Sequence, residues 1–547
     1  MTSPGTYWRT VRHLRAGQLT GRIAFRLRRP SADLRPAPDR RVASGPWATP
    51  ARRLQSLEAP ATFDLLGARH ALADVDWNGS GPTLLWRYHQ HYFDDLNAEG
   101  AEMRGDAHAA LIERWLADNP PGQGPGWAPY PLSLRIVNWI KWLLGGHDAS
   151  AAMLASLAVQ TRWLAQRLET HLLGNHLFAN AKALVFAGLF FDGAEAARWL
   201  ASGTDILGRE LPEQVLDDGG QFELSPMYHA LALEDVLDLA NAIAALGDGL
   251  AAAERLRREL IARIPKMRRW LAAMSHPDAT LGRFNDCADG IAPAAAELAQ
   301  LADALGTAEA PRDGDDGVVV LADSGYVRVE RDRVVALIDV ARVGPDYLPG
   351  HAHADTLSFE LSLDGRRLIV NGGTSRYGED DVRQRERSTA AHSTVEVAAT
   401  NSSEVWAGFR VGRRARPTGP RVSRDGDALV IDGAHDGYAH LAGRPIHRRR
   451  WRFDSAGLIV EDEVGPGRPA ALARFHLAPG LALAAVGERH WRVSNGTRPI
   501  AEAEIAIGRA FPEVSFFAPR FGVVEPTACL AVALADGRSL TRWSWLA

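Results

Sequence analysis

Apolar residues in the first half of the chain recur with the period of an amphipathic α-helix. Between about 105 and 306 they return at i, i+3, i+4 and i+7, and short Gly, Pro or Asn breaks separate the runs. The clearest runs span 132–146, 151–169, 176–191, 227–247 and 251–274. Because amphipathic helices joined by short turns pack as antiparallel neighbours, this half is predicted to form a helical barrel.

The period changes to two after the segment 306–317, which is polar and rich in Gly, Asp and Pro, as a domain boundary should be. Runs such as VVVLADSGYVRVERDRVVALIDV and HRRRWRFDSAGLIVEDEV then alternate and turn at DG, AG or SG. Many short strands at this spacing predict an antiparallel β-sandwich. The chain is therefore expected to be multidomain, α then β, with a helical domain at 51–310 and a sandwich at 311–547.

The first 50 residues predict a basic, Pro-punctuated arm that is irregular or partly helical. Its Arg9, Arg12, Arg15 and Arg22 could touch anionic lipid, but membrane contact is not the expectation. The segment lacks the apolar core of a secretory signal, and no window approaches the length of a membrane-spanning helix. A cytoplasmic location is therefore expected, with periplasmic or membrane-peripheral locations left open.

Composition narrows the class of protein only slightly. Apolar residues make up 46% and charged residues 23%, as in ordinary globular proteins. The net charge of −4 argues against a nucleic-acid partner, yet a mildly acidic protein can still bind an acidic polymer through a locally positive cleft. Two cysteines exclude a disulfide framework, and the 16 Trp suit either sugar stacking or a core.

Three segments of the helical half are dense in polar and aromatic residues. The segment 84–96 carries Tyr88 and His89 among further aromatic residues. Asn175 and His176 begin a predicted helix, where Asn175 alone would be read as an N-cap. Tyr228 begins another, with Ser225 and Pro226 as the predicted cap and first turn.

The segment 344–378 in the strand half is the most specific of the four. Its HAHAD run would place His351, His353 and Asp355 on one face of an extended segment, which favours metal ligation or acid–base chemistry. His392 follows in RQRERSTAAHSTVEV, whose arginines meet anionic sugar or form a solvated turn.

These motifs together resemble the heparinase II/III family. The matching patterns are GNH-x₃-NAKAL-x-FAG-x-FF, DGG-x-FE-x-SPMYH-x₃-LED, GHAHAD-x-LSFEL followed by VNGGTS, and WRYHQHYFDDL. They run in order from about Leu84 to at least His392. The resemblance implies an incomplete α/α-toroid followed by an antiparallel β-sandwich, with a catalytic cleft between them. It also implies a lyase that cleaves a uronic-acid-containing glycan, such as a glycosaminoglycan, alginate or an exopolysaccharide, by β-elimination.

The resemblance implies a role for each catalytic residue. Asn175, with His176 beside it, would neutralise the substrate carboxylate. Tyr228 would act as base, acid or both, and His351 as a second acid–base group. Because a phenol has a pKa near 10, a basic cleft or a histidine would have to assist Tyr228. The predicted substrate contacts are Tyr88, His89, Tyr130, Arg135, His229, Tyr347 and Arg387.

Relatives also imply a structural zinc, although no cofactor is expected to be required. The matching positions are His353, His392 and Asn371, where Asn371 replaces the usual Asp and is a poorer ligand. Without the metal, His353 would pair with Asp355. At Ala179 some relatives carry a Glu, so His176 is expected to lack that partner.

Three other functions stay open at this point. A uronate C5-epimerase would use the same proton abstraction. A glycoside hydrolase would need two carboxylates from Asp217, Asp218, Glu223 and Asp286. A non-catalytic glycan-binding factor in surface polysaccharide assembly would need neither. The sequence leaves open which polymer is bound and its sulfation, endo or exo action, syn or anti elimination, and the oligomeric state.

Overall fold

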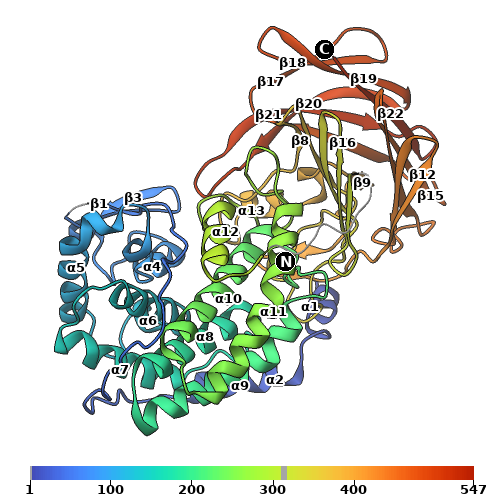
Figure 1. Cartoon of the computed structure of the whole chain (residues 1–547). Coiled ribbons are helices and arrows are strands. Elements are labelled where there is room, and N and C mark those ends of the chain that lie inside the picture. Colours follow the sequence, from blue (N-terminus) through green and yellow to red (C-terminus); the bar gives the residue numbers. More distant parts are fainter. Residues whose placement is uncertain (1–2, 59, 309–316, 547) are drawn as a thin grey trace.

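The computed structural model describes residues 3–58, 60–308 and 317–546 and divides into a helical half and a strand half (Figure 1). Most of the predicted boundary, 309–316, lies outside the described residues. Helices make up most of the regular structure as far as residue 304, and antiparallel strands make up nearly all of it after 317. The α-then-β order predicted from the two periods is confirmed.

The helical half is built from long helices connected by short turns. Their bounds are α4 Leu84–Gln90, α5 Gly105–Asp118, α6 Pro129–Leu144, α7 Ala151–Ala165, α8 Gly174–Phe190, α9 Gly193–Gln214, α10 Pro226–Leu246, α11 Ala251–Ala273 and α12 Ala295–Ala304. Helix α8 packs against α6, α7, α9 and α10 and is buried along almost its whole length. This central position explains why its sequence is apolar on every side rather than on one stripe.

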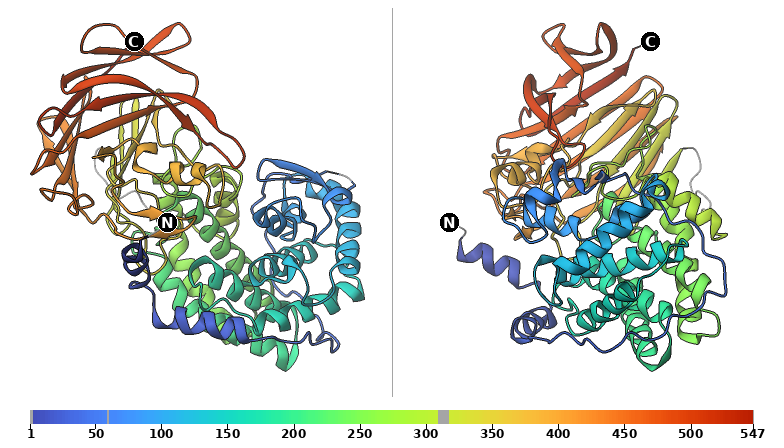
Figure 2. Two further views of the ribbon diagram at one scale, coloured as in Figure 1. Left: turned by 180° about the vertical axis from the view of Figure 1, so that it is seen from behind. Right: turned by 90° about the vertical axis from the view of Figure 1, so that its left-hand side faces the viewer.

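The N-terminal arm is more ordered than an irregular segment. It contains α1 (Pro4–Val11) and α2 (Ala16–Leu27). A small sheet of β1 (Leu57–Glu58), β2 (Thr62–Leu65) and β3 (Ala68–Ala71) and the short α3 (Leu72–Val75) follow an extended stretch. Figure 2 shows the two arm helices lying along the outside of the molecule, from the sandwich to the helical half.

The strand half is a sandwich of two antiparallel sheets. The first runs β12-β13-β14-β15-β22-β19-β18-β17, and the second runs β20-β21-β16-β8-β7-β6-β5-β4, with β9 paired to β16. The strands of the first sheet are β12 Pro417–Asp425, β13 Ala428–His435, β14 Ile446–Asp454, β15 Gly457–Gly465, β17 Leu481–Ala485, β18 His490–Asn495, β19 Arg498–Ile507 and β22 Arg538–Trp545. Those of the second are β4 Val318–Leu321, β5 Tyr326–Arg331, β6 Val334–Asp339, β7 Phe359–Leu363, β8 Arg366–Val370, β9 Val395–Val397, β16 Ala471–Leu477, β20 Arg509–Phe517 and β21 Glu525–Ala533. The short α13 (Asp381–Glu386) lies between β8 and β9, and the two-stranded ribbon of β10 (Val405–Trp406) and β11 (Arg410–Val411) lies between β9 and β12.

Tryptophan side chains are part of the hydrophobic cores of both halves. Trp77, Trp115, Trp139 and Trp270 are fully buried among the helices, and Trp451 packs edge-on against Phe359 inside the sandwich. No helix of the described chain has the length and apolar character needed to cross a membrane.

Candidate active site

A cleft of about 560 Å³ lies where the helical half meets the loops of the sandwich. Helices α4, α6, α8 and α10 contribute from one side, and the segments 346–351 and 409–414 contribute from the other. Eight residues predicted for the site line this cleft: Tyr88, His89, Tyr130, Asn175, His176, Tyr228, Tyr347 and His351. Residues that are far apart in the sequence therefore meet around one space. No tryptophan is among the described residues that line it.

Asn175 is the second residue of α8, not its cap. The N-cap position is taken by Leu173, which makes no side-chain cap and has φ 64° and ψ −159°. Such a backbone conformation is strained for a residue with a branched side chain, and strain of this kind concentrates at functional sites. The Asn175 amide is half-buried, lines the cleft and has no hydrogen-bond partner within the described part of the chain. Its N–H donors are therefore free for a ligand.

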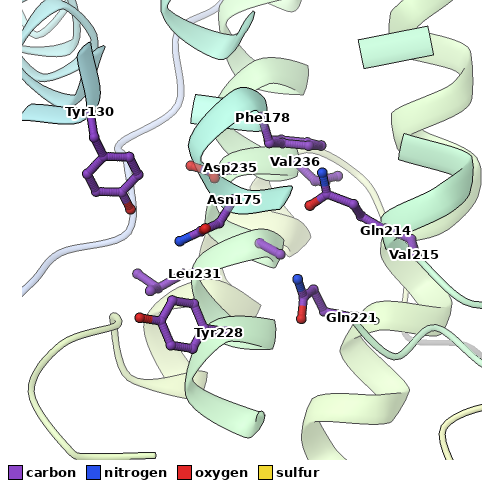
Figure 3. Close-up of a pocket in the computed structure, with 11 residues that line it drawn as sticks. Tyr130, Asn175, Phe178, Gln214, Val215, Gln221, Tyr228, Leu231, Asp235 and Val236 are labelled. Atoms are coloured by element: carbon purple, nitrogen blue, oxygen red, sulfur yellow. The ribbon is translucent and has the colours of Figure 1, made fainter. Parts of the chain in front are cut away.

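Figure 3 shows how Asn175 is aimed. Its amide and the phenol of Tyr228 point to the same side, and the hydroxyl of Tyr130 faces that space from α6. Gln214 and Gln221, together with Asn175, Tyr130 and Tyr228, line a small cavity of about 30 Å³ next to the cleft. That cavity is large enough for about one water molecule.

His176 has a carboxylate partner that the sequence motif does not reveal. Its Nδ1 lies 3.2 Å from Glu169 Oε1, and Glu169 Oε2 accepts a hydrogen bond of 3.1 Å from Asn180. Burial lowers the pKa of His176, but the charge and hydrogen bond of Glu169 outweigh it, so the pKa lies above its ordinary value. Although Ala179 carries no carboxylate, His176 is not left without a partner.

Tyr228 begins α10 in the way the sequence predicts. Its backbone N–H donates to the hydroxyl of the N-cap Ser225 over 3.2 Å, and Pro226 opens the first turn. The phenol oxygen lies 3.1 Å from that of Tyr377. Burial, and then the nearby Tyr377 and Asp286, raise the pKa of Tyr228 well above 10. Of the two ways in which Tyr228 could be assisted, a lowered phenol pKa is therefore not present, and a histidine that shares the proton stays a prediction.

His351 stacks on Tyr228 and is held by a glutamate. The two rings lie 3.7 Å apart between centroids at an angle of 17°. His351 Nδ1 donates to Glu223 Oε2 over 2.5 Å, which leaves Nε2 as the free ring nitrogen. The segment that carries His351 is an irregular loop between β6 and β7, so the predicted extended HAHAD segment is wrong. Only His351 of that motif lines the cleft.

Three residues predicted to contact substrate lie elsewhere. Arg135 is fully buried, where it donates to Gln160 and stacks on Trp115. His229 is fully buried between the backbone of Gln221 and Met267.

Arg387 is the third of these. It is fully buried and donates to the backbone carbonyls of Ala352 and Ala407. It therefore braces the loop that carries His351 and does not reach the cleft. A buried polar side chain is satisfied by the protein itself, and the sequence motif alone does not distinguish it from a ligand contact.

The predicted zinc ligands form a hydrogen-bonded cluster behind the cleft. His353 Nδ1 lies 3.2 Å from His392 Nε2, and His353 Nε2 donates to Asp286 over 2.9 Å, so Asp286 replaces the expected partner Asp355. Burial lowers the pKa of His353 to about 4. The amide oxygen of Asn371 already accepts from the Ser393 N–H, and its nitrogen donates to Ser358.

Neutral imidazoles can bind zinc, but His353 and His392 are only two, and both atoms of the Asn371 amide already have hydrogen-bond partners. Within the described ranges, no group of three His, Cys, Asp or Glu side chains is placed to hold a metal ion. The zinc stays a prediction.

The carboxylates considered for hydrolysis have other partners. Asp286 forms a fully buried ion pair with Arg383. Burial raises the pKa of Asp286, but the Arg383 charge and the hydrogen bond with His353 lower it by more, so the pKa lies far below its usual value. Asp218 accepts hydrogen bonds from the backbone and hydroxyl of Ser324. Of the four candidates only Glu223 lines the cleft, and it holds His351.

The charge of the cleft is mixed rather than uniformly basic. Arg53 is committed to Glu234 at 2.5 Å, and Arg414 lies 3.4 Å from Asp346. Burial lowers the pKa of His89 to about 4, so His89 is neutral at neutral pH. The ionisable Arg, Asp and Glu residues that line the cleft are Arg22, Arg53, Arg410, Arg414, Asp94, Glu223 and Asp346.

A helical toroid joined to an antiparallel sandwich, with a cleft of amide, phenol and imidazole groups between them, places the chain in the toroid-and-sandwich class. A model of the heparinase II/III N-terminus matches residues 96–305, and a model of the heparinase II/III-like C-terminal region matches residues 314–539. The chain belongs to the heparinase II/III-like family.

Curated relatives and solved structures agree with this assignment. A heparin-sulfate lyase from Bacteroides stercoris is 27% identical over 335 residues, 56% of this chain and 46% of that protein. One from Pedobacter heparinus is 27% identical over 363 residues, 58% of this chain and 53% of that protein. The chain thus spans about half the length of these relatives.

The same fold is present in solved structures. Heparinase III shares it with a TM-score of 0.64 at 17% identity, covering 86% of this chain and 79% of that one. Heparan sulfate lyase HepC from Pedobacter heparinus shares it with a TM-score of 0.57 at 17% identity, covering 96% and 87%.

Proposed function

We propose that this protein is a polysaccharide lyase that cleaves a uronic-acid-containing glycan by β-elimination. The observation that carries the proposal is the meeting of Asn175, Tyr228 and His351 on one cleft. These side chains supply an amide donor, a protonated phenol and an imidazole. Elimination next to a carboxylate needs those three capacities: neutralisation, proton removal and protonation of the leaving group.

The first step is neutralisation of the substrate carboxylate, whose charge otherwise opposes removal of the C5 proton. The free amide of Asn175 donates to that carboxylate. His176 carries a raised pKa because of Glu169, and as an imidazolium it adds a charge-assisted donor. Both groups stabilise the negative charge that develops as the proton leaves, which is electrostatic catalysis.

The proton transfers fall to Tyr228 and His351. Tyr228 keeps its proton in the free protein because its pKa is raised, so it is suited to protonate the departing O4. The free Nε2 of His351 is suited to accept the C5 proton, while Glu223 stabilises the imidazolium that results. General acid–base catalysis of this kind contributes roughly 10²–10⁴-fold to a rate.

The names of the curated relatives make a glycosaminoglycan of the heparan sulfate type the first substrate to test. Both relatives named above are heparin-sulfate lyases. Alginate and other uronate polymers belong in the same screen. Asn175 and His176 would bind the uronate carboxylate, which all these polymers share. Contacts further along the cleft would then have to select the polymer.

The test is a screen of heparan sulfate, chondroitin sulfate, hyaluronan and alginate for the ultraviolet absorbance of an unsaturated uronate product. The wild type should give this signal on at least one polymer, and Tyr228→Phe should lose about 10²–10⁴-fold of the rate. Tyr438→Phe, which removes a hydroxyl that donates to the Val395 carbonyl inside the sandwich and away from the cleft, is the matched control and should keep most of it.

Other outcomes would contradict the proposal. Uptake of solvent deuterium at C5 without chain shortening would identify a C5-epimerase. Chain shortening without the unsaturated product would identify a hydrolase. Binding of the polymer with no chemical change would leave a glycan-binding factor.

A further inference from the structure

The N-terminal arm lies outside the two segments that match the family models, yet it lines the cleft. The models match 96–305 and 314–539, whereas the arm helices α1 and α2 lie within 4–27. We infer that this arm forms a substrate-binding wall of the cleft and that Arg22 binds an acidic group of the glycan there. This inference rests on the proposed function for the identity of the ligand.

One end of the arm is fastened to the sandwich half. Arg9 donates to both oxygens of Glu404, over 2.8 and 2.6 Å, and Thr6 donates to the same carboxylate over 2.9 Å. The ring of Tyr7 meets Trp406 edge-on at 4.9 Å between centroids, and the Trp406 indole donates to Thr10 over 3.0 Å. A bidentate pair with aromatic packing fixes the orientation of α1.

The other end is fastened to the cleft loop and the helical half. Arg15 lies 3.6 Å over the ring of Tyr347 and pairs with Glu213. Gln18 is 2% exposed and donates to the Tyr347 carbonyl over 3.3 Å. Phe25 packs on His171 at 4.5 Å between centroids. The arm therefore spans from the sandwich to the loop that precedes Asn175.

Between these fastenings one stripe of the arm faces the cleft. Its members come from both arm helices and the turn between them: Tyr7, Thr10 and Val11 of α1, Leu14 of the turn, and Gln18 and Arg22 of α2. The apolar members of this stripe offer a surface for the apolar faces of sugar rings. Arg22 is the only cation among them.

Arg22 is free to bind a ligand, whereas two of the other three arginines that line the cleft are not. Arg53 and Arg414 are committed to carboxylates. Arg22 is exposed to the cleft and makes no hydrogen bond or ion pair with any residue the structure describes. Its neighbour Gly21 lies so close to His171 that a Cβ there would be 3.0 Å from the His171 Cβ, so the backbone holds Arg22 at this wall. A planar guanidinium suits a carboxylate or a sulfate bound through two oxygens.

Arg26, one turn further along α2, provides a matched control because it is exposed and does not line the cleft. Arg22→Gln should raise KM for the cleaved polymer about fivefold with kcat unchanged, the size of one charge-assisted contact in a partly exposed setting. Arg26→Gln should match the wild type, and Arg22→Lys should recover part of the loss. Equal melting temperatures of the variants would show that the fold is intact.

Affinity electrophoresis in gels that contain each polymer separates this inference from the proposed function. The inference is supported if a polymer retards the wild type and Arg26→Gln equally but retards Arg22→Gln less. This holds even if no polymer is cleaved. If Arg22→Gln and Arg26→Gln have the same KM and the same gel mobility, Arg22 does not bind the glycan and the inference is wrong. This holds even if the lyase activity is found. A wild type that neither binds nor cleaves any polymer overturns both.

Discussion

The charge of His176 depends on one buried carboxylate. Glu169 keeps the pKa of His176 above its ordinary value despite burial, so the imidazolium persists to higher pH than it would alone. Substrate carboxylates are bound best while that charge is present. The affinity for uronate should therefore fall as pH rises through the raised pKa.

Replacing Glu169 by Gln keeps the size of the side chain and an acceptor for Asn180 but removes the charge. The pKa of His176 should drop, and KM near neutral pH should rise about threefold to tenfold, the range of a charge-assisted hydrogen bond. Because burial then leaves the pKa of His176 in Glu169→Gln below the ordinary value near 6.5, the KM values of the two proteins should converge only at a pH well under that value. Steady-state kinetics across pH provide the measurement. Asp205→Asn, on the exposed side of α9, is the control, and parallel profiles for Glu169→Gln and wild type would refute the assignment.

Asp286 is a residue on which the local fold depends. It meets Arg383 and His353 in a site that is fully buried. Asp286→Asn leaves the Arg383 charge unpaired and should lower the free energy of unfolding by about 3–5 kcal/mol. The folded-state pKa of Asp286 is depressed, so its contribution is present above the unfolded pKa and is lost as pH falls.

Urea unfolding at neutral and acidic pH checks this prediction. The gap between variant and wild type should be widest near neutrality and narrow in acid. Glu463→Gln, in an exposed pair with Arg448, should change stability by less than about 1 kcal/mol. A similar small change for Asp286→Asn would show that the pair is not needed.

At the scale of elements, helix periodicity located most of the helical half. The predicted runs match α6, α7, α8, α10 and α11 to within a few residues because an apolar repeat is a local property of sequence. Helix α9 was not among them, since glycines interrupt its repeat. Gly188 and Gly203 are where α8 and α9 touch: a Cβ at Gly203 would lie 2.8 Å from the Ala181 carbonyl. Glycine therefore weakens the apolar repeat of α9 and at the same time allows α9 to pack closely against α8.

The position of a site residue in the fold was easiest to predict where a motif begins an element. Asn175 and Tyr228 lie in the first turns of α8 and α10, so the motif also fixed their place. Tyr377 and the arm enter the site through contacts between distant segments, which no local pattern indicates, whereas Glu169 lies seven residues before His176, outside the motif that begins α8. Arg135 and Arg387 were wrongly expected to line the cleft. Their partners are buried backbone and side-chain groups from other parts of the chain, which the local sequence does not indicate.

The attachment of α1 is an element-scale feature that can be tested directly. Glu404→Gln removes the negative charge of the carboxylate to which Arg9 donates two hydrogen bonds. Because this pair is partly exposed, its loss should cost about 1 kcal/mol, which makes opening of the arm about fivefold more frequent. Limited trypsin digestion, read by mass spectrometry, should then cut after Arg12 and Arg15 about fivefold faster. Glu461→Gln, which removes a pairing carboxylate far along the sandwich, should digest like the wild type. Equal arm cleavage in both variants would mean that Glu404 does not hold the arm.

At the scale of the whole molecule, a protein with a net charge of −4 binds an acidic polymer only through local positive groups. Those interactions are screened at high ionic strength, where the Debye length falls from about 10 Å at 0.1 M salt to about 3 Å at 1 M. KM for the polymer should therefore rise steeply with salt, whereas kcat should change little because the catalytic groups are shielded in the cleft. A fall in kcat with a constant KM would contradict a charge-steered cleft.

The mass of the products tests the lyase chemistry most directly. A defined uronate oligosaccharide that the protein cleaves is incubated with it, and the two fragments are weighed by mass spectrometry. β-Elimination predicts fragment masses that add up to the mass of the substrate, with the unsaturation on the fragment that keeps the uronate, and Tyr228→Phe should produce neither fragment at a comparable rate. Fragments that together exceed the substrate by one water would show hydrolysis and contradict the roles given to Asn175, Tyr228 and His351.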